Sequence, residues 1–164
     1  MIRKASLALV ILFAGAAGLR AQTTVELKPT KDSKVSGSVS IAAMGKGVHF
    51  TGTVNGLTPG KHGFHIHEKG DCSAPDAASA GGHFNPDQKQ HGDASAAEKH
   101  AGDLGNIEAG ADGSAKINLH MNGLTLGTEA NSIKGKAIII HGNPDDFSQP
   151  TGNAGPRVAC GVIN

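Results

Sequence analysis

Histidines at metal-ligand spacing are the first chemical signal in this sequence. His65 and His67 are two residues apart in the apolar run 63–67, so in a strand both imidazoles project from one face. His141 ends a second apolar run, 137–141, from which a neighbouring strand could deliver a third imidazole. His100 and Asp103 stand three residues apart, which brings an imidazole close to a carboxylate.

Seven side chains are candidate ligands. They are His65, His67, His83, His91, His100, Asp103 and His141. Imidazoles without a thiolate suit oxidised copper or zinc, and a mixed His and Asp set suits zinc. Taken singly, the pair His65 and His67 would also fit a solvent-facing strand, and Asp103 would fit a turn. The set as a whole predicts two metal sites with nitrogen and oxygen ligands.

Eight short segments with apolar positions at strand spacing must place these ligands. They are 25–27, 35–41, 48–54, 63–67, 104–109, 115–119, 137–141 and 159–163. Asn55-Gly56 and Asp112-Gly113 are turn signals, and the latter predicts a tight hairpin. The chain has 24 Gly among 164 residues and neither Trp nor Tyr, which favours a turn-rich all-β fold. We predict an eight-stranded antiparallel Greek-key sandwich or flattened barrel.

Two long segments, 70–102 and 143–156, show no sustained periodicity. A loop of about thirty residues without secondary structure is uncommon in a compact domain unless it is functional or tied down. The first segment contains His83, His91 and His100 but few apolar residues. We therefore expect a bound zinc ion to order it.

The first 21 residues are typical of an export signal. Arg3 and Lys4 precede the apolar and small-residue run 5–19, and Leu19-Arg20-Ala21 is similar to a small-residue cleavage site. A membrane anchor is the alternative, but about 15 apolar residues are short for a span of about 20. We expect a signal peptide over 1–21, one mature domain over 22–164 without a membrane anchor, and a periplasmic or secreted location.

Charge and cysteine usage limit the function classes. The formal net charge of +1 becomes −2 when the three basic leader residues are removed, which argues against a nucleic-acid binder. Cys72 and Cys160 in an oxidising compartment most simply form a disulfide. They form no CxxC motif, which disfavours a thiol redox enzyme.

Several longer motifs stand in order along the mature chain. They are GFHIHE at 63–68, GHFNP at 82–86, HG at 91–92, HAGDLGN at 100–106 and GNAGPRVACGVI at 152–163. Together they resemble the copper/zinc superoxide dismutases over roughly residues 25–163, and GDCS at 70–73 is similar to the exported bacterial branch. The resemblance implies the same all-β fold, with copper and zinc as cofactors and superoxide as substrate.

The resemblance also implies roles for individual residues. Copper would be held by His65, His67, His83 and His141, and zinc by His83, His91, His100 and Asp103, with His83 as the bridge. Asp145 would link the free ring nitrogens of His65 and His91. Arg157 would attract and orient the superoxide anion. His49, His62 and His120 match no ligand position, so we expect them to be structural or surface residues.

The implied reaction is dismutation of superoxide to dioxygen and hydrogen peroxide, an antioxidant defence outside the cytoplasm, with His83 also relaying a proton. A copper and zinc carrier on the same fold is the rival hypothesis, and the zinc set disfavours a copper-only dismutase. Two departures bear on catalysis. The loop 143–156 contains no Lys for steering, and Pro156 precedes Arg157 where a smaller residue is usual. A monomer and a homodimer both stay open.

Overall fold

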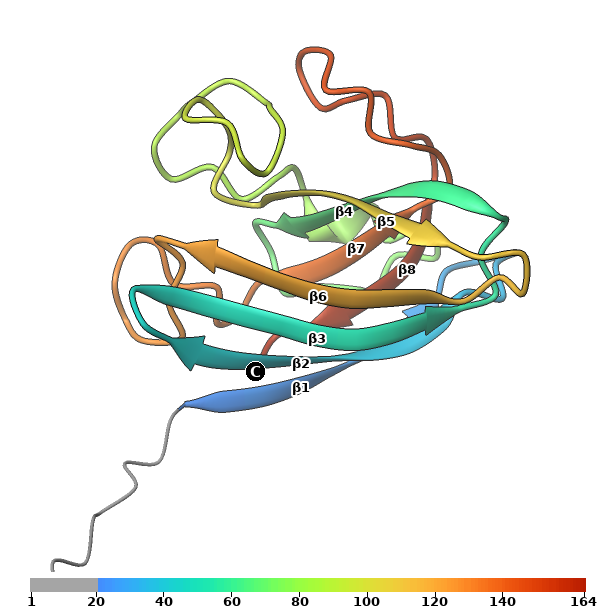
Figure 1. Cartoon of the computed structure of the whole chain (residues 1–164), viewed down its shortest axis with the longest axis horizontal. Helices are drawn as coiled ribbons and strands as arrows, with labels where there is room; N and C mark the ends of the chain where they lie inside the picture. The colour runs from blue at the N-terminus through green and yellow to red at the C-terminus, as the bar shows by residue number, and fades with distance from the viewer. Residues whose placement is uncertain (1–20) are drawn as a thin grey trace, which may run out of the picture.

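The strands form one closed antiparallel barrel in the computed structural model, which describes residues 21–164 (Figure 1). They are β1 (Gln22–Pro29), β2 (Ser36–Met44), β3 (Gly47–Asn55), β4 (Gly60–His67), β5 (Asp103–Ala109), β6 (Ala115–Asn122), β7 (Ala137–His141) and β8 (Arg157–Val162). Their order around the barrel is β1-β2-β3-β6-β5-β4-β7-β8, so β3 pairs with β6 and β4 with β7, and the β3–β4 and β6–β7 connections cross over other strands in the Greek-key manner. The predicted all-β antiparallel fold is confirmed, and closure makes it a barrel.

The predicted strands differ from the observed ones mainly at their ends. The last strand is Arg157–Val162, two residues earlier at its start than the apolar pattern indicated, because Arg157 pairs with His141 across β7 and β8. Ile163 follows the strand but is fully buried. The predicted signal peptide lies, apart from Ala21, outside the described residues. No helix within 21–164 is long and apolar enough to cross a membrane.

Alternation along the strands builds the core. Val39 and Ile41 of β2 and Val48 and Phe50 of β3 are fully buried inside the barrel. Strand β4 differs from most of the others because its last six residues are all buried, as are all five residues of β7. Phe64 and Ile66 pack in the core, whereas the alternating positions of the same strand carry histidines. The outer face of β4 must therefore be covered, and the two long loops cover it.

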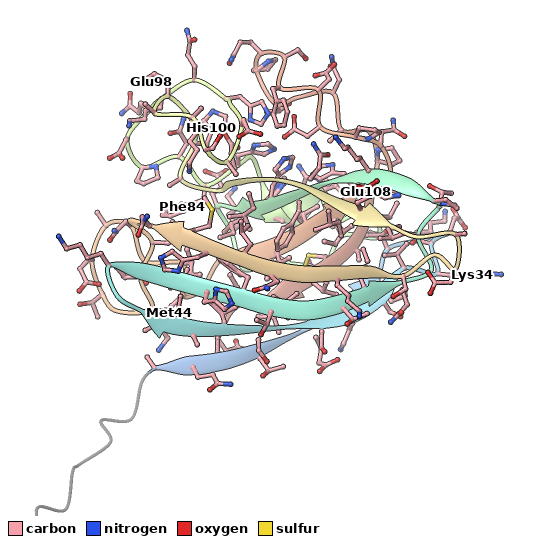
Figure 2. The ribbon with its side chains drawn as sticks, in the orientation of Figure 1. Lys34, Met44, Phe84, Glu98, His100 and Glu108 are labelled. Atoms are coloured by element: carbon pink, nitrogen blue, oxygen red, sulfur yellow. A yellow bond between two sulfur atoms is a disulfide. The ribbon has the colours of Figure 1, made fainter. Side chains whose placement is uncertain are left out.

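Both long connections lie on the same side of the barrel, beside β4, β5 and β7 (Figure 1). The β4–β5 connection contains one short 3-10 helix, η1 (Ala78–Ala80). It returns to β4 as an isolated antiparallel bridge between His67 and His83. Phe84 next to this bridge is buried in the core and points down from the loop in Figure 2. A buried side chain and strand-like pairing thus hold a segment that has almost no secondary structure.

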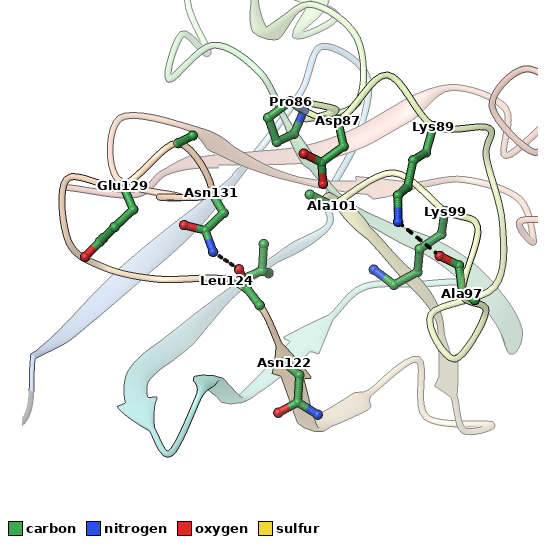
Figure 3. Close-up of a pocket in the computed structure, with 12 residues that line it drawn as sticks. Pro86, Asp87, Lys89, Ala97, Lys99, Ala101, Asn122, Leu124, Glu129 and Asn131 are labelled. Carbon is green, nitrogen blue, oxygen red and sulfur yellow. Dashed lines mark hydrogen bonds between the residues drawn. The ribbon is translucent and has the colours of Figure 1, made fainter.

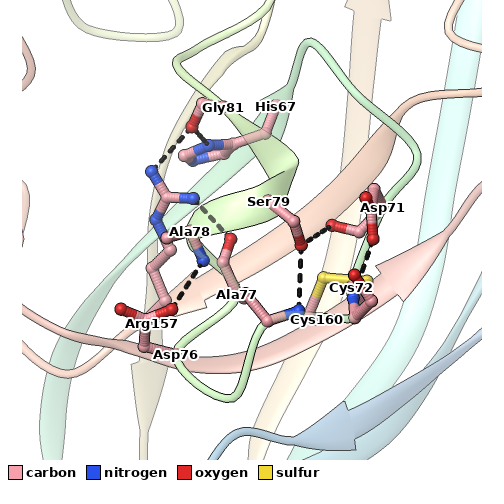
Figure 4. The surroundings of a disulfide bond; sticks show 12 residues. His67, Asp71, Cys72, Asp76, Ala77, Ala78, Ser79, Gly81, Arg157 and Cys160 are labelled. Atoms are coloured by element: carbon pink, nitrogen blue, oxygen red, sulfur yellow. Dashed lines mark hydrogen bonds between the residues drawn. A yellow bond between two sulfur atoms is a disulfide. The ribbon is translucent and has the colours of Figure 1, made fainter.

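The disulfide is a second anchor for this connection. Cys72 and Cys160 are bonded, with their Cα atoms 5.9 Å apart, and they join the loop to β8 (Figure 4). The predicted pairing is confirmed. The bridge closes a loop of 88 residues. In the chain-entropy model, closing a loop of this length stabilises the fold by about 4 to 5 kcal/mol.

The far end of the same connection borders a hollow of about 570 Å³ beside the β6–β7 turn (Figure 3). Lys89 Nζ donates to the carbonyl oxygen of Ala97 at 3.3 Å, and Lys99 Nζ donates to that of His100 at 3.2 Å. Lys89 therefore cross-links the loop that carries His91 and His100, whereas Lys99 bonds only the residue that follows it. None of the seven candidate ligands lines this hollow.

Candidate metal centre

Adjacent strands and two local irregularities bring three of the histidines together. His65 and His67 come from β4, and His141 ends β7, which pairs directly with β4. The ladder is irregular between Gly63 and His65 and again between Ile140 and His141. Such bulges bend a strand and redirect its side chains. The rings of His65 and His141 lie 4.9 Å apart between centroids.

His83 reaches the same place from the β4–β5 connection. Its bridge with His67 brings the two rings to 5.0 Å between centroids, and its ring lies 4.1 Å from that of His65. The four histidines His65, His67, His83 and His141 are all buried, and their candidate ligand atoms lie within 4.8 Å of one another. This four-imidazole group can hold a metal ion.

A second group shares His83. It consists of His83, His91, His100 and Asp103, all buried and with candidate ligand atoms within 4.8 Å of one another. His83 Nδ1 lies 2.8 Å and His100 Nδ1 3.1 Å from Asp103 Oδ1. His91 Nδ1 lies 3.0 Å from Asp103 Oδ2. The seven residues predicted from the sequence are thus brought together as two four-residue groups joined at His83.

Asp103 is the only anion in the second group. Its Oδ2 accepts hydrogen bonds from the backbone N–H groups of His100 at 2.7 Å and Gly92 at 3.1 Å. Burial alone would raise the pKa of this carboxyl, but the hydrogen bond from His83 and the charges of His91 and His100 lower the pKa to about 2. Asp103 is therefore an ionised carboxylate held in place by the backbone.

Asp145 connects the two groups. His65 Nε2 donates to its Oδ2 at 2.7 Å, and His91 Nε2 donates to its Oδ1 at 2.9 Å. The side-chain amide of Asn106 fixes the backbone of Asp145, donating to its carbonyl at 3.0 Å and accepting from its N–H at 2.8 Å. Burial would raise the pKa of Asp145, but the hydrogen bonds from His65 and His91 hold the pKa below its usual value.

The Asp145 carboxylate and the His91 ring lie close to the backbone of Gly152, and the link between them depends on this glycine. Gly152 has a φ of +75°, and a Cβ atom there would overlap Asp145 Oδ1 and crowd His91 Nε2. Only glycine adopts this backbone conformation readily and leaves that space free. The glycine of the GNAGPR motif is therefore needed for the carboxylate to reach both imidazoles.

The bare ring nitrogens show that these residues fit a metal. His65 Nδ1, His67 Nε2, His91 Nδ1 and His141 Nε2 are buried and have no hydrogen-bond partner, although His91 Nδ1 lies 3.0 Å from Asp103 Oδ2. In each ring the other nitrogen is bonded. His67 Nδ1 donates to the carbonyl of Gly81 at 2.9 Å, and His141 Nδ1 donates to that of Gly155 at 3.2 Å. A buried polar atom without a partner costs free energy, and a bound cation removes that cost.

Burial keeps the rings of His67 and His141 neutral. Desolvation lowers the pKa of His67 to about 2, and desolvation together with the charge of His65 lowers the pKa of His141 to about 3. A neutral imidazole with one N–H donor engaged keeps a lone pair on the other nitrogen. The donor set of the first group is therefore four imidazoles and that of the second is three imidazoles and a carboxylate, as copper and zinc sites require.

Two residues outside the ligand set also position it. Gln149 accepts from the backbone N–H of His91 at 3.1 Å and donates to the carbonyl of His91 at 2.8 Å. No sequence signal marked this contact, because a lone Gln in a loop has no distinctive spacing. His62 is buried, with its ring between the carbonyl oxygens of His141, at 2.9 Å, and Thr58, at 2.8 Å. The expectation that His62 is structural agrees with this position.

Arg157 lies beside the first group. Its Nη1 donates to the carbonyl of Ala77 and its Nη2 to that of Gly81, both at 2.6 Å (Figure 4). The carbonyl of Gly81 also accepts from His67. Arg157 and His67 thus share one acceptor, on the loop that the disulfide ties to β8. These two bonds use two of the five N–H groups of the guanidinium.

Comparison with known proteins agrees with the fold and the donor set. Residues 35–163 match the family model described as copper/zinc superoxide dismutase (SODC). The chain is 47% identical over 137 residues to a Cu-Zn superoxide dismutase 2 of Brassica juncea, covering 79% of this chain and 89% of that protein. It is 50% identical over 123 residues to a Cu-Zn superoxide dismutase of Onchocerca volvulus, covering 69% and 77%.

A solved structure is also similar. The crystal structure of the clock protein EA4 matches with a TM-score of 0.79 and 35% identity, covering 87% of this chain and 93% of that one. The fold, the two joined ligand groups and the family match define one class of protein. The chain belongs to the copper/zinc superoxide dismutase family. It is an oxidoreductase that dismutates superoxide, with copper and zinc as its metals.

The Asp145 link generates a prediction. Asp145→Asn replaces two acceptor oxygens by one acceptor and one donor, so at least one of the two histidines loses its partner. We expect metal affinity to fall by about 10- to 100-fold, the range for such outer contacts. Competition with a chelator, followed by metal analysis, measures the loss.

Asp146→Asn is the matched control, because Asp146 is an exposed neighbour that bonds Ser148 and Asn153 instead of the histidines. It should leave metal affinity unchanged. Equal affinities in the Asp145 variant and the wild type would show that the link does not support the ligands.

Proposed function

We propose that the group His65, His67, His83 and His141 holds copper and that the group His83, His91, His100 and Asp103 holds zinc. The observation that carries this assignment is the set of bare buried nitrogens described above, combined with the single carboxylate in the second group. Four imidazoles suit oxidised copper, and a closed set of three imidazoles and one carboxylate suits a structural zinc. Asp145 then joins the two sites from outside.

When bound, copper supplies the one-electron chemistry that oxidises one superoxide to dioxygen and reduces a second to peroxide. The chain must then provide orientation for an anion and protons for the product. Arg157 orients the anion. Its guanidinium is fixed by Ala77 and Gly81 next to His67, where its permanent charge attracts superoxide to the proposed copper group.

His83 can hold a proton for the product. Its Nδ1 faces Asp103 and His100, at 2.8 Å and 3.3 Å. Its Nε2 is then the ring nitrogen on the side of the proposed copper group. A proton held at Nε2 can pass to the peroxide product, and the contact with Asp103 keeps the ring oriented while it does so.

Guidance of the anion depends on local charge. The mature chain carries a net charge of −2, and the loop 143–156 contains no Lys. We therefore propose Arg157 as the guiding cation, and its hydrogen bond to the Gly81 carbonyl that also accepts from His67 supports this. A carrier of copper and zinc on this fold would need the ligands but would have no use for a guanidinium held beside them, which favours catalysis.

We also propose that the protein acts outside the cytoplasm after loss of residues 1–21. The leader pattern supports this, and so does the Cys72–Cys160 bridge, since disulfides persist in oxidising compartments. N-terminal sequencing of the protein recovered from its native host should begin near Gln22. A soluble protein that begins at Met1 would contradict the proposal.

The two-site assignment predicts that the metals can be removed separately. His100→Ala should lose zinc and keep copper, because its ring belongs to the second group and meets the first only at the shared His83. His67→Ala should lose copper and keep zinc. Elemental analysis of both purified variants, loaded under the same conditions, gives the stoichiometry. A loss of the same metal from both variants would refute the assignment.

Arg157 predicts a graded effect on turnover. Arg157→Ala should keep both metals but lower the second-order rate with superoxide by about tenfold or more, because anion attraction acts on encounter. Arg157→Lys should fall between wild type and Ala, since Lys keeps the charge but loses the planar fork. Arg157→Glu should be slowest. Pulse radiolysis on metal-replete protein measures these rates.

Lys134→Ala, which removes an exposed charge from the β6–β7 connection, is the control and should keep the wild-type rate. The rate of the wild type should fall with ionic strength more than that of Arg157→Ala. Full activity of metal-replete Arg157→Ala would place anion guidance elsewhere in the chain.

A further inference from the structure

Two histidines outside the metal centre face each other on the outside of the barrel. His49 of β3 and His120 of β6 are directly opposed partners in the antiparallel ladder. Their neighbours Val48 and Phe50 are fully buried in the core, whereas both imidazoles are part-exposed. Because strand residues alternate between faces, both rings project from the outer surface. Directly opposed side chains on such a surface are close enough to interact.

The spacing of this pair is close to that of a pair in the first metal group. The ring centroids of His49 and His120 are 6.2 Å apart, with an angle of 29° between the ring planes. The centroids of His65 and His67, which share the first metal group, are 6.4 Å apart. Two imidazoles at this separation can direct one nitrogen each toward a common ion.

The hydrogen bonding also repeats the pattern of the metal centre. His120 Nε2 lies 3.2 Å from Asn122 Oδ1, and as the donor to this oxygen it leaves a lone pair on Nδ1. The Nδ1 atoms of both His49 and His120 are buried and have no hydrogen-bond partner. A carbonyl or amide oxygen that holds one ring nitrogen while the other binds a metal is the usual support for a histidine ligand.

We propose that His49 and His120 form a surface chelate for a divalent transition-metal ion of the zinc, nickel or copper type. Two imidazoles without a carboxylate or thiolate select such ions over magnesium or calcium, which require oxygen ligands. Water completes the coordination, so this site binds more weakly than the closed groups of the centre. It is separate from the two metals of the dismutase reaction and does not depend on their assignment.

The test uses the full mature protein with its copper and zinc sites already filled. Titration with Ni²⁺ at about pH 7.5, where an ordinary imidazole is mostly neutral, is followed by calorimetry and elemental analysis. The wild type should bind one further ion per chain. His49→Gln and His120→Gln should each weaken this binding by more than about tenfold, which corresponds to about 1.4 kcal/mol.

Met44→Leu is the matched control, since Met44 is an exposed residue at the nearby end of β2 and has no part in the proposed chelate (Figure 2). It should bind Ni²⁺ like the wild type. Superoxide turnover should be unchanged in all three variants, which separates the surface site from the centre. Absence of a further ion in the wild type would overturn the proposal. So would unchanged binding in either histidine variant, because a chelate needs both rings.

Discussion

The structure depends on a set of buried imidazole nitrogens that have nothing in the protein to bond. Four rings each engage one nitrogen with a carboxylate or carbonyl oxygen and leave the other bare in the interior. Such an arrangement is unfavourable unless a cation occupies it. The loops that bury these rings contribute few apolar side chains to the core, so metal binding and loop order are coupled. Metal binding therefore also stabilises the folded conformation of the loops.

The barrel strands and the loops position different ligands of the metal centre. The strands supply rigid positions for His65, His67 and His141, and bulges beside two of these residues redirect their rings. The loops supply His83, His91 and His100, which are held by the bridge to β4 and by the contacts of Gln149 and Asp145. Arg157 connects the barrel and the loops. It is the first residue of β8, and it bonds loop carbonyls that the disulfide keeps near that strand. The guanidinium of Arg157 is thus placed by covalent and hydrogen-bonded restraints rather than by packing alone.

Much of this centre was predictable from the residues. The spacing of His65 and His67 in a strand, the His100 and Asp103 pair and the two aperiodic segments indicated two nitrogen and oxygen metal sites. The resemblance to a known family assigned each ligand, and the structure brings all seven together. The roles of Asn106, Gln149 and Gly152 were not assigned. Their contacts join segments at least 39 residues apart or depend on a single φ angle, and neither leaves a local pattern in the sequence.

The sequence by itself determined the fold class, the approximate strands and the donor chemistry, because alternation and side-chain type are local properties. Tertiary structure decided that the sheet closes and that Arg157 and His67 share the carbonyl of Gly81. It also decided that His49 and His120, which are 71 positions apart in the chain, oppose each other across two strands. These are consequences of strand register, and register is set by the packing of the whole barrel rather than by any one segment.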